Sequence, residues 1–519
     1  MRHERLIEAS RGGMGYRAAR IPTGTKADYR TGREYCSPGM CNPVYFTVGG
    51  LVNYLKRLRD VEGIPLQRIL DEYVFVTAGS CGPCRFGMYE SEFRLALLNS
   101  SFDGFRVIVI QQKGGLNQLE EGAGLEVNAE FVRRLVTALM IGDLINDIGH
   151  QVRPYEMVPG QTDRALDEAV ERIGGVLGRA GAARSWWGVL CQTLGKGYGR
   201  ILRECRGIID EVEVDYMRPK PVCKITGEFW AQMTESDGNC RLFSFLEEQG
   251  AEVIVEPLTT WIVYLLDSAV RRKKESKLRG WKGSFVHEIR SRIVSFRDVM
   301  ALKLASLLIR REYERMRQAL GGLPRPLPRM SELRDLARPF FNDKISGGEG
   351  HMEVGKTLYY SVKRLSHIVL SVKPFGCLPS TQSDGVQGAS LTHYARLGHH
   401  ILFVPVETAG EGEIGVHSRV LMVIEEAKAL CGREFEACLD STRYAIEDIR
   451  AWRMQRHDLR RPFQTVPRRE GVVGRAANFV YALSLRTDAG RYRDLRETCL
   501  AGMRPSESYS HQSETEWRK

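Results

Sequence analysis

The chain has 519 residues and a mass of 58.7 kDa, and 43% of its residues are hydrophobic, so it is too long for one small domain and can bury more than one globular core. Its formal charge of +11 and pI near 9.0 are compatible with nucleic acid, an acidic protein or an anionic substrate as a partner, and charge alone does not choose among them. With 12 cysteines, no secretory signal and no apolar run of membrane length, we expect a cytoplasmic protein whose clustered thiols bind metal instead of forming disulfides.

The first half of the chain alternates strand-type and helix-type segments. An irregular arm rich in Gly and Arg is expected over residues 1–35, followed by a helix over 50–59. Strand-type runs follow at 73–77 and 106–110, and the apolar spacing predicts a helix over 131–148. Strands that alternate with helices indicate a parallel sheet.

A helical, Gly-punctuated passage over 163–214 leads to a second α/β block. The expected strands of this block cover 221–226, 252–257, 367–372 and 399–405, and a long basic helical insertion separates the second strand from the third.

These segments predict an α/β fold with two parallel-sheet domains of the Rossmann or flavodoxin-like type and a cluster site in the cleft between them. The expected units are an arm at 1–35, a first α/β domain at 36–215, a second at 216–432 with its helical insertion at about 261–322, a helical Arg-rich region at 433–505 and a disordered tail at 506–519.

The motif Cys81-Gly82-Pro83-Cys84 is expected on a turn between a strand and a helix. Ser80 can cap that helix and Pro83 fits its first turn, which would direct free backbone N–H groups and the positive end of the helix dipole toward the sulfurs. Such surroundings favour thiolate, the form that binds metal or does redox chemistry. The motif alone leaves open a redox dithiol, half a zinc site or part of an iron–sulfur site, and no second Cys-x-x-Cys completes a zinc ribbon.

Three further thiols are candidates to complete such a site. Cys377 follows a strand of the second block, and Cys36 and Cys41 precede the first block. Ligands drawn from distant turns at strand ends suit a cluster in an interdomain cleft, while Cys36 is equally well read as an ordinary thiol. The cysteines expected to be ordinary thiols are Cys191, Cys205, Cys223, Cys240, Cys431, Cys438 and Cys499.

Two other patterns favour structural readings. Residues Gly350–Thr357 match the phosphate-loop pattern G-x-x-x-x-G-K-[ST], but no convincing core strand precedes them, so an ordinary Gly-rich helix start is favoured. The basic insertion alternates Arg and Glu at helical spacing around Arg310–Arg315, which favours a solvated face with salt bridges over a nucleic-acid surface.

A set of longer motifs resembles the 2-hydroxyacyl-CoA dehydratase and activator superfamily, and more narrowly the iron–sulfur portion of the large CoA-enzyme activase proteins, akin to dehydratase subunits and double-cubane cluster proteins. The similarity runs in order from about Tyr35 to about Leu430. The motifs are Cys41-Asn42-Pro43 with Thr47-Val48-Gly49, Cys81–Tyr89, Gly142–Asp147 with Arg153–Glu156, Lys224–Trp230 and Lys373–Ser380.

This resemblance implies a [4Fe–4S] or double-cubane cluster that a partner ATPase of the actin/hexokinase type reduces with low-potential electrons. The partner's nucleotide signature is not found in this chain, which therefore looks like the electron acceptor. The ligands implied are Cys41, Cys81, Cys84 and Cys377. Four thiolate ligands suit electron transfer, whereas three leave an iron free to bind a substrate oxygen. Because Cys36 lies nearby in the sequence, the number of cysteine ligands stays open between three and four.

Three residues are candidates for the shell around the cluster. Arg85 is expected to offset the negative charge of the cluster, or to be a surface charge on its helix. Glu228 is a candidate proton donor or substrate contact, or simply a helix-start carboxylate. Ser380 is a candidate donor to a cluster sulfur, or a cap for the following turn.

Three functions follow from these observations. The first is an iron–sulfur redox protein in ATP-driven reductive or dehydratase chemistry, acting on an acyl-CoA or another small substrate, with a homo- or hetero-oligomer as its expected assembly. The second is a non-catalytic scaffold or regulator that holds a metal on its cysteines and binds an acidic partner. The third, ranked last, is a nucleic-acid-binding protein.

Overall fold

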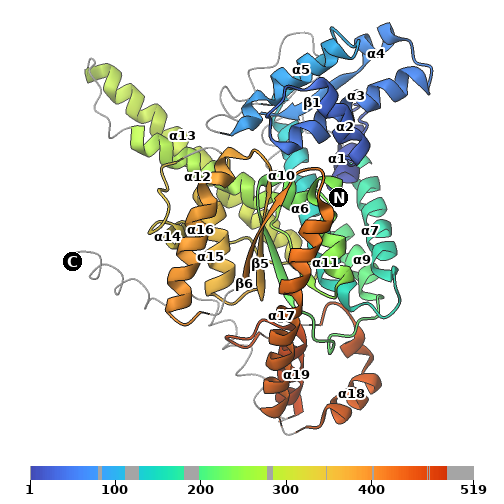
Figure 1. Ribbon diagram of the computed structural model, residues 1–519, viewed down its shortest axis with the longest axis vertical. Coiled ribbons are helices and arrows are strands. Elements are labelled where there is room, and N and C mark those ends of the chain that lie inside the picture. The colour runs from blue at the N-terminus through green and yellow to red at the C-terminus, as the bar shows by residue number, and fades with distance from the viewer. Residues whose placement is uncertain are drawn as a thin grey trace.

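The computed structural model describes residues 2–79, 84–110, 128–179, 198–276, 285–345, 348–399, 402–442, 444–464, 466 and 468–487. Within these residues the chain is a mixed α/β protein with two small parallel sheets (Figure 1). This confirms the predicted α/β class. The expected disordered tail, Cys191 and Cys499 lie outside these residues, as does Cys81.

The N-terminal arm is helical, contrary to the irregular segment that we expected. Helix α1 (His3–Gly12) packs against two later helices, and α2 (Lys26–Tyr35) begins with a capping box. In that box the backbone N–H of Thr25 donates to Asp28 at 2.8 Å, and the backbone N–H of Asp28 donates to the Thr25 hydroxyl at 3.3 Å. Thr25, followed three residues later by a carboxylate, is thus a sequence signal for the start of a helix.

Helices α2 and α3 (Asn42–Asp60) touch backbone to backbone. A Cβ atom at Gly49 would lie 1.8 Å from the Asp28 carbonyl oxygen, and one at Gly32 would lie 1.9 Å from that of Tyr45. Only glycine fits this crossing. The crossing fixes the segment between the two helices, which carries Cys36 and Cys41.

A two-stranded parallel sheet completes the N-terminal unit, which is drawn in blue at the top of Figure 1. Strands β1 (Val74–Ala78) and β2 (Arg106–Ile110) pair in register from Val74 with Arg106 to Ala78 with Ile110. Both agree with the predicted strands. The helices of this unit that follow α3 are α4 (Leu66–Glu72), η1 (Arg85–Met88) and α5 (Tyr89–Asn99).

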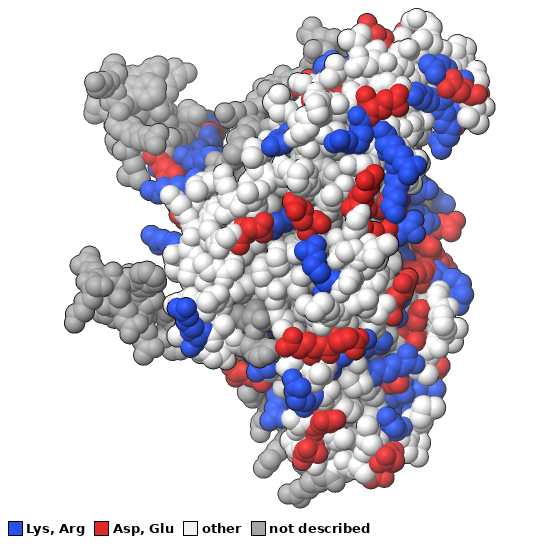
Figure 2. Space-filling view, in the orientation of Figure 1, with Lys and Arg blue, Asp and Glu red and all other residues white. Residues whose placement is uncertain are grey.

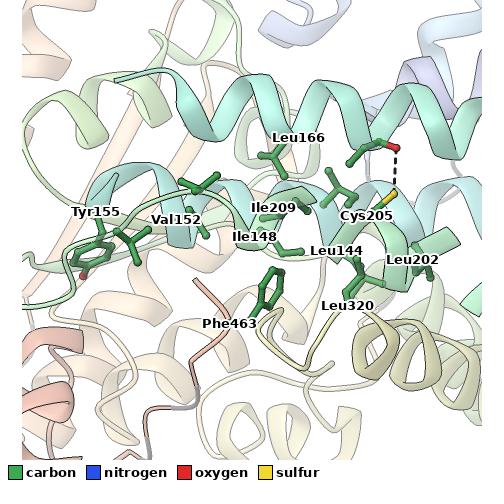
Figure 3. Close-up of a cluster of buried hydrophobic side chains, with 14 of the residues drawn as sticks. Leu144, Ile148, Val152, Tyr155, Leu166, Leu202, Cys205, Ile209, Leu320 and Phe463 are labelled. Carbon is green, nitrogen blue, oxygen red and sulfur yellow. Dashed lines mark hydrogen bonds between the residues drawn. The ribbon is translucent and has the colours of Figure 1, made fainter. Parts of the chain in front are cut away.

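A helical body lies beside the two sheets. Its long central helix, α6 (Ala129–Val152), matches the predicted helix and continues into η3 (Arg153–Tyr155). Helices α7 (Gln161–Arg179) and α9 (Gly199–Asp210) pack with α1 and α6 around a shared apolar core (Figure 3). In this core the Cys205 thiol donates to the Ala169 carbonyl at 3.6 Å, which agrees with the ordinary buried thiol expected there.

The second sheet has four parallel strands in the order β4-β3-β5-β6. One face packs against α11 (Leu242–Glu248) and α17 (Glu413–Asp440), and the other packs against α15 (His351–Val362). Both faces are therefore buried, as expected for a parallel sheet. The strands are β3 (Val222–Gly227), β4 (Glu252–Ile254), β5 (Ile368–Pro374) and β6 (Leu402–Thr408).

The connection between β4 and β5 contains the predicted helical insertion. Helices α12 (Leu258–Ser276) and α13 (Phe285–Ala319) form it, and α13 projects beyond the body at the upper left of Figure 1. The shorter elements of the second block are α10 (Phe229–Met233), η4 (Asp237–Asn239), α14 (Met330–Ala337) and α16 (Leu378–Arg396).

The C-terminal part of the described chain is helical, as expected, and lies at the lower end of Figure 1. Helix α17 runs across residues 432 and 433, where we had expected a boundary between units. It is followed by α18 (Ile446–Gln455), η5 (His457–Arg460) and α19 (Arg475–Thr487). None of the described helices is both long enough and apolar enough to span a membrane.

Charges of both signs alternate over the face shown in Figure 2, where Lys and Arg stand beside Asp and Glu without merging into one basic field. Two ion pairs lie within α13, in the last part of the insertion: Arg315 bonds Glu312 at 2.6 Å and Arg317 bonds Glu314 at 2.7 Å. The ion pairs agree with the salt bridges that the sequence favoured, but the face is only partly solvated, because Glu312 is buried at 8% exposure.

Candidate metal centre

The two central strands of the second sheet, β3 and β5, are parallel neighbours that end at the same edge. From β3 the chain moves outward to β4 on one side, and from β5 it moves outward to β6 on the other, so the winding reverses between the two central strands. Ligands of open parallel sheets bind outside the carboxyl ends of the strands at such a reversal. Glu228 follows β3 and Cys377 follows the β5 strand end, so both stand at this carboxyl edge.

Four of the candidate residues occupy the N-cap position of a helix. Cys41 precedes α3, Cys84 precedes η1, Glu228 precedes α10 and Cys377 precedes α16. Pro43 and Pro379 stand in the first turns of α3 and α16, where a missing N–H does no harm. The first turns of these helices carry N–H groups that have no partner within the helix, and such groups stabilise negative sulfur.

Direct contacts join the N-terminal unit to this edge. The backbone N–H of Asn42 donates to the Phe375 carbonyl at 3.2 Å, and its side-chain amide donates to the Thr408 carbonyl at 3.2 Å. A Cβ at Gly376 would lie 3.3 Å from the Cys41 Cα and 3.6 Å from the Arg85 guanidinium. Cys377 is therefore brought next to the segment that carries Cys41 and next to Arg85.

Cys41 is buried, and burial raises the pKa of its thiol to about 11. Its sulfur lies 3.0 Å from the Tyr89 hydroxyl, which lowers the pKa, whereas the charges of Glu228 and Cys84 raise it. Arg85 lowers the pKa of Cys41, as expected for a cation placed to offset charge at this site. The guanidinium of Arg85 also donates to the Gly39 carbonyl.

The other two described thiols have the same surroundings. Burial raises the pKa of Cys84, the Phe86 N–H lowers it, and Glu228 raises it again. Burial also raises the pKa of Cys377, and so does Glu228. The Cys377 thiol donates to the Ser380 hydroxyl at 3.1 Å, and this contact lowers the pKa of Cys377. Ser380 therefore contacts one of the candidate ligands, while its donation to a cluster sulfur stays a prediction.

Glu228 is both a helix cap and a perturbed carboxyl group. Its side chain accepts from the Ala231 N–H at 2.8 Å, so it is the helix-start carboxylate that was one of the two predictions for it. Burial and, to a smaller extent, the nearby carboxylates of Glu349 and Glu353 raise the pKa of Glu228 to about 7, although the N–H groups of Ala231 and Trp230 lower it. The charge of Glu228 acts on Cys41, Cys84 and Cys377 alike, so all three thiols lie near it.

The donor chemistry of this group fits a thiolate-bound metal. Three thiols and a glutamate share one buried region, and their mutual charges oppose ionisation, so a cation at the centre is what would allow the thiols to deprotonate together. Soft sulfur ligands select iron–sulfur clusters or zinc. Across the part of the chain that the structure describes, no three His, Cys, Asp or Glu side chains are close enough to hold a metal ion by themselves, and Cys81 lies outside that part.

Cys36 stands apart from this group. It ends α2 within the apolar cluster of the N-terminal unit, and burial together with the charge of Glu92 raises its pKa to about 12. Its electrostatic partner is thus Glu92, whereas Glu228 is the partner of the other three described candidates. The remaining described thiols are buried in helices, strands and turns elsewhere.

Several residues near the site escaped the sequence reasoning. Tyr89 ends one of the family motifs and was given no role, yet its hydroxyl contacts Cys41. Lys356 belongs to the stretch with the phosphate-loop pattern and Glu349 immediately precedes that stretch, while Gly350 precedes α15 as the favoured reading expected. The Lys356 ammonium is buried and bonds Glu349 at 2.6 Å, so it is engaged within the fold.

The motif residues of 142–156 line a cavity of about 780 Å³ between α6 and the end of β4. Asp143 accepts from His3 Nε2 at 2.9 Å and from the N–H groups of Leu258 and Thr259 at 2.8 and 2.9 Å, so it caps α12. Arg153 bonds Glu247 at 2.7 Å. These contacts give the motif a structural role in joining the helical body to the second sheet.

No protein-family model matches this chain, and neither a curated protein nor a solved structure matches it significantly.

Proposed function

We propose that this protein is an iron–sulfur redox protein of the 2-hydroxyacyl-CoA dehydratase and activase type, which accepts low-potential electrons from a partner ATPase for reductive or dehydratase chemistry. The observation that supports the proposal is that Cys41, Cys84 and Cys377 all lie near Glu228 at the carboxyl edge of the second sheet, although Cys377 follows Cys84 by 293 positions. The proposed fold is two Rossmann or flavodoxin-like domains with the cluster between them.

Cys41, Cys84, Cys377 and Cys81 would hold the cluster, and this chain's other residues would tune it. The Phe86 N–H bonds the Cys84 sulfur and the Ser380 N–H bonds the Cys377 sulfur, and these contacts would make reduction easier. The Ser380 hydroxyl, which accepts from the Cys377 thiol at 3.1 Å, would donate to that sulfur once it is a metal-bound thiolate. The cluster supplies one-electron chemistry when bound. Arg85 would offset its negative charge from beside Cys41.

The rim of the site suits a protein that delivers electrons. Phe375 and Leu378, which flank Cys377, are 60% and 43% exposed, and Met88 on the neighbouring η1 is 55% exposed. Exposed apolar side chains that cluster on a surface mark contact sites. An electron donor docked on this rim would stand directly over the thiols.

The test is anaerobic purification of the full chain, with iron and sulfide quantitation and visible absorption. We expect a brown protein with several irons and matching sulfide per chain, and loss of both in the Cys81→Ser/Cys84→Ser and Cys377→Ser variants. A Cys438→Ala variant is the matched control, because Cys438 is a buried thiol on α17 away from this edge. Colourless, iron-free wild-type protein would refute the proposal.

A second candidate function is the binding of an acidic partner without catalysis, and one observation favours it. On the projecting part of α13, Phe296, Met300, Leu304 and Leu307 are 60, 49, 56 and 62% exposed, at the spacing of one helix stripe. The exposed Arg272, Lys274, Arg297 and Lys303 stand near this stripe on α12 and α13. A narrow apolar seam with basic flanks fits an amphipathic helix with acidic flanks.

Metal analysis separates the two functions. One zinc per chain, with no sulfide, would favour the scaffold, whereas iron with sulfide favours the redox protein. The seam itself is tested with the Met300→Glu/Leu304→Glu variant, which should lose an acidic helical partner while its iron content stays unchanged.

A further inference from the structure

The amino edge of the four-stranded sheet, opposite the thiols, holds a separate cavity of about 290 Å³. It opens between the C-terminal end of α15, the starts of β5 and β6, and α17. Neither the candidate metal centre nor the proposed electron transfer uses it. An inference about it therefore stands apart from the proposed function.

Two buried hydroxyls line this cavity without a hydrogen-bond partner among the described residues. Ser361 and Ser366 are 5% and 8% exposed, and the Oγ atom of each is unpaired. Buried hydroxyls in native proteins are almost always satisfied, because leaving one unpaired costs free energy. Two unpaired hydroxyls on one cavity wall point to a ligand that accepts hydrogen bonds.

The charge balance of the cavity favours an anion. Arg364 and Arg433 supply two guanidinium groups at its rim, and Glu434 is the carboxylate among them. The charge of Glu434 is already engaged, because it accepts from the N–H groups of Val473 and Gly474 at 3.1 and 3.0 Å. It also bonds Arg364 at 3.3 Å, while Arg433 forms no ion pair with any described residue.

His367 completes this arrangement as a neutral group. The backbone N–H of Val222 donates to its Nδ1 at 2.9 Å, so the ring proton lies on Nε2 and is donated to Glu434 at 3.1 Å. The imidazole thus holds the carboxylate in place. One uncompensated positive charge remains at the cavity, on Arg433.

Part of the cavity lining is aliphatic. Val369, Leu402, Leu430 and Ala437 contribute to it, which suits a short hydrocarbon body. A fully hydrated ion such as inorganic phosphate would leave these side chains without a partner. An organic acid can contact both the polar and the aliphatic side chains.

We propose that this cavity binds a small aliphatic carboxylate, whose carboxylate group accepts from the Ser361 and Ser366 hydroxyls and pairs with Arg433, and whose hydrocarbon body lies against Leu402 and Leu430. This is a site on the far edge of the sheet from the thiols. Strand β5 connects the two, running from the cavity to the turn before Cys377.

The first experiment measures binding of butyrate to the full chain by isothermal titration and by saturation-transfer NMR. We expect millimolar or tighter binding, with butyramide and inorganic phosphate each weaker by about tenfold or more, a loss of about 1.4 kcal/mol. Butyramide keeps the hydrocarbon body and removes the charge, and phosphate does the reverse. Equal binding of butyramide, tighter binding of phosphate, or no binding of butyrate would each overturn the proposal.

Variants then place the binding in this cavity. Arg433→Gln should weaken butyrate binding by about tenfold, because an exposed guanidinium is lost without disturbing the core. Ser361→Ala/Ser366→Ala should weaken it similarly, and Leu430→Trp should abolish it by filling the cavity. Arg419→Gln, an exposed position on the same helix, is the matched control and should bind as the wild type does.

Circular dichroism of each variant shows whether it is folded, so that a loss of binding is not confused with a loss of structure. Should Leu430→Trp fail to fold, Arg433→Gln decides the matter, because its side chain is exposed. Unchanged affinity in a folded Arg433→Gln variant would show that the cavity holds solvent only.

Discussion

The two edges of the four-stranded sheet are built from the same strands yet carry opposite chemistry. At the carboxyl edge, Glu228 lies among thiols and other carboxylates, and burial raises its pKa to about 7. At the amino edge, Glu434 accepts from His367 and two backbone N–H groups, and although burial raises its pKa, these donors lower it below the ordinary value. The fold therefore disfavours the charge of Glu228 at one edge and favours the charge of Glu434 at the other.

This difference follows from what stands at each edge of a parallel sheet. The carboxyl ends of β3 and β5 lead into helix starts, which bring N–H groups, and a buried cation there, Lys373, is held by the carboxylate of Glu353. At the amino edge, Arg364 follows the end of α15 and Arg433 lies within α17. A cationic metal centre is thus suited to the first edge and an organic anion to the second.

The largest expected effect concerns the close backbone packing at the carboxyl edge. Gly227 ends β3 with a φ of 119°, and a Cβ there would lie 2.0 Å from the Val372 carbonyl oxygen. Gly227→Ala should lower the free energy of unfolding by more than about 4 kcal/mol, measured by urea denaturation, or prevent folding. Gly207→Ala is the control, because its Cβ meets nothing within 4 Å in helix α9. It should gain up to about 1 kcal/mol, and equal losses in both would contradict the packing argument.

The next largest effect concerns the buried ion pair between Lys224 on β3 and Glu256. Lys224 is fully buried and bonds Glu256 at 2.7 Å, so Lys224→Met would leave a buried carboxylate without its main partner. The expected loss of unfolding free energy is about 3 kcal/mol. At the amino edge the Arg364–Glu434 pair is half-exposed, and Arg364→Gln should cost less than about 1 kcal/mol. A reversed order of the two losses in urea denaturation would count against the burial assigned to the two pairs.

The two glutamates predict opposite pH dependence in the metal-free chain. A glutamate in the unfolded chain has a pKa of about 4.3. Because the folded pKa of Glu228 is raised to about 7, its favourable contribution is present at low pH and is lost as the pH rises from the unfolded value through 7. Glu228→Gln should therefore become more stable than the wild type by about 2 kcal/mol above pH 7.

Glu434 gives the opposite sign. Its pKa is lowered in the fold, so its contribution is present above the unfolded pKa and is lost as the pH falls through the folded one. Glu434→Gln should be less stable than the wild type at neutral pH, and the difference should shrink in acid. Urea denaturation of both variants from pH 4 to pH 8 measures this; parallel pH curves for the two variants would refute the contrast.

The elements of the sheet were predictable because each strand is a short apolar run followed by a helix. All six predicted strands are present, with ends displaced by a few residues. The nearness of Cys377 to Cys41 was expected from strand ends and from the family motifs. Helices α1 and α2 were missed, because α1 is polar over most of its surface and its stability comes from packing on α6 and α7.

The amino-edge cavity could not be predicted from the sequence. Ser361 ends α15, Ser366 lies in the next turn, and Arg433 comes from α17, so the group exists only after the three segments pack. Whether a serine hydroxyl has a partner depends on such packing and leaves no local signal. Tyr89 was missed for a related reason, since helical spacing marks a side chain as buried and does not show where its hydroxyl points.

The smallest expected effect compares one hydroxyl at each edge. Tyr89→Phe removes a hydroxyl that contacts the Cys41 sulfur at 3.0 Å, and the metal-free chain should lose about 1 kcal/mol of unfolding free energy. Ser366→Ala removes a buried hydroxyl that has no described partner, so in the absence of carboxylate it should cause no loss. Added butyrate should then stabilise the wild type more than Ser366→Ala, whereas Tyr89→Phe should respond as the wild type does. A loss in ligand-free Ser366→Ala as large as that in Tyr89→Phe would mean that the serine hydroxyl is already satisfied, and the contrast between the two edges would then rest on charge alone.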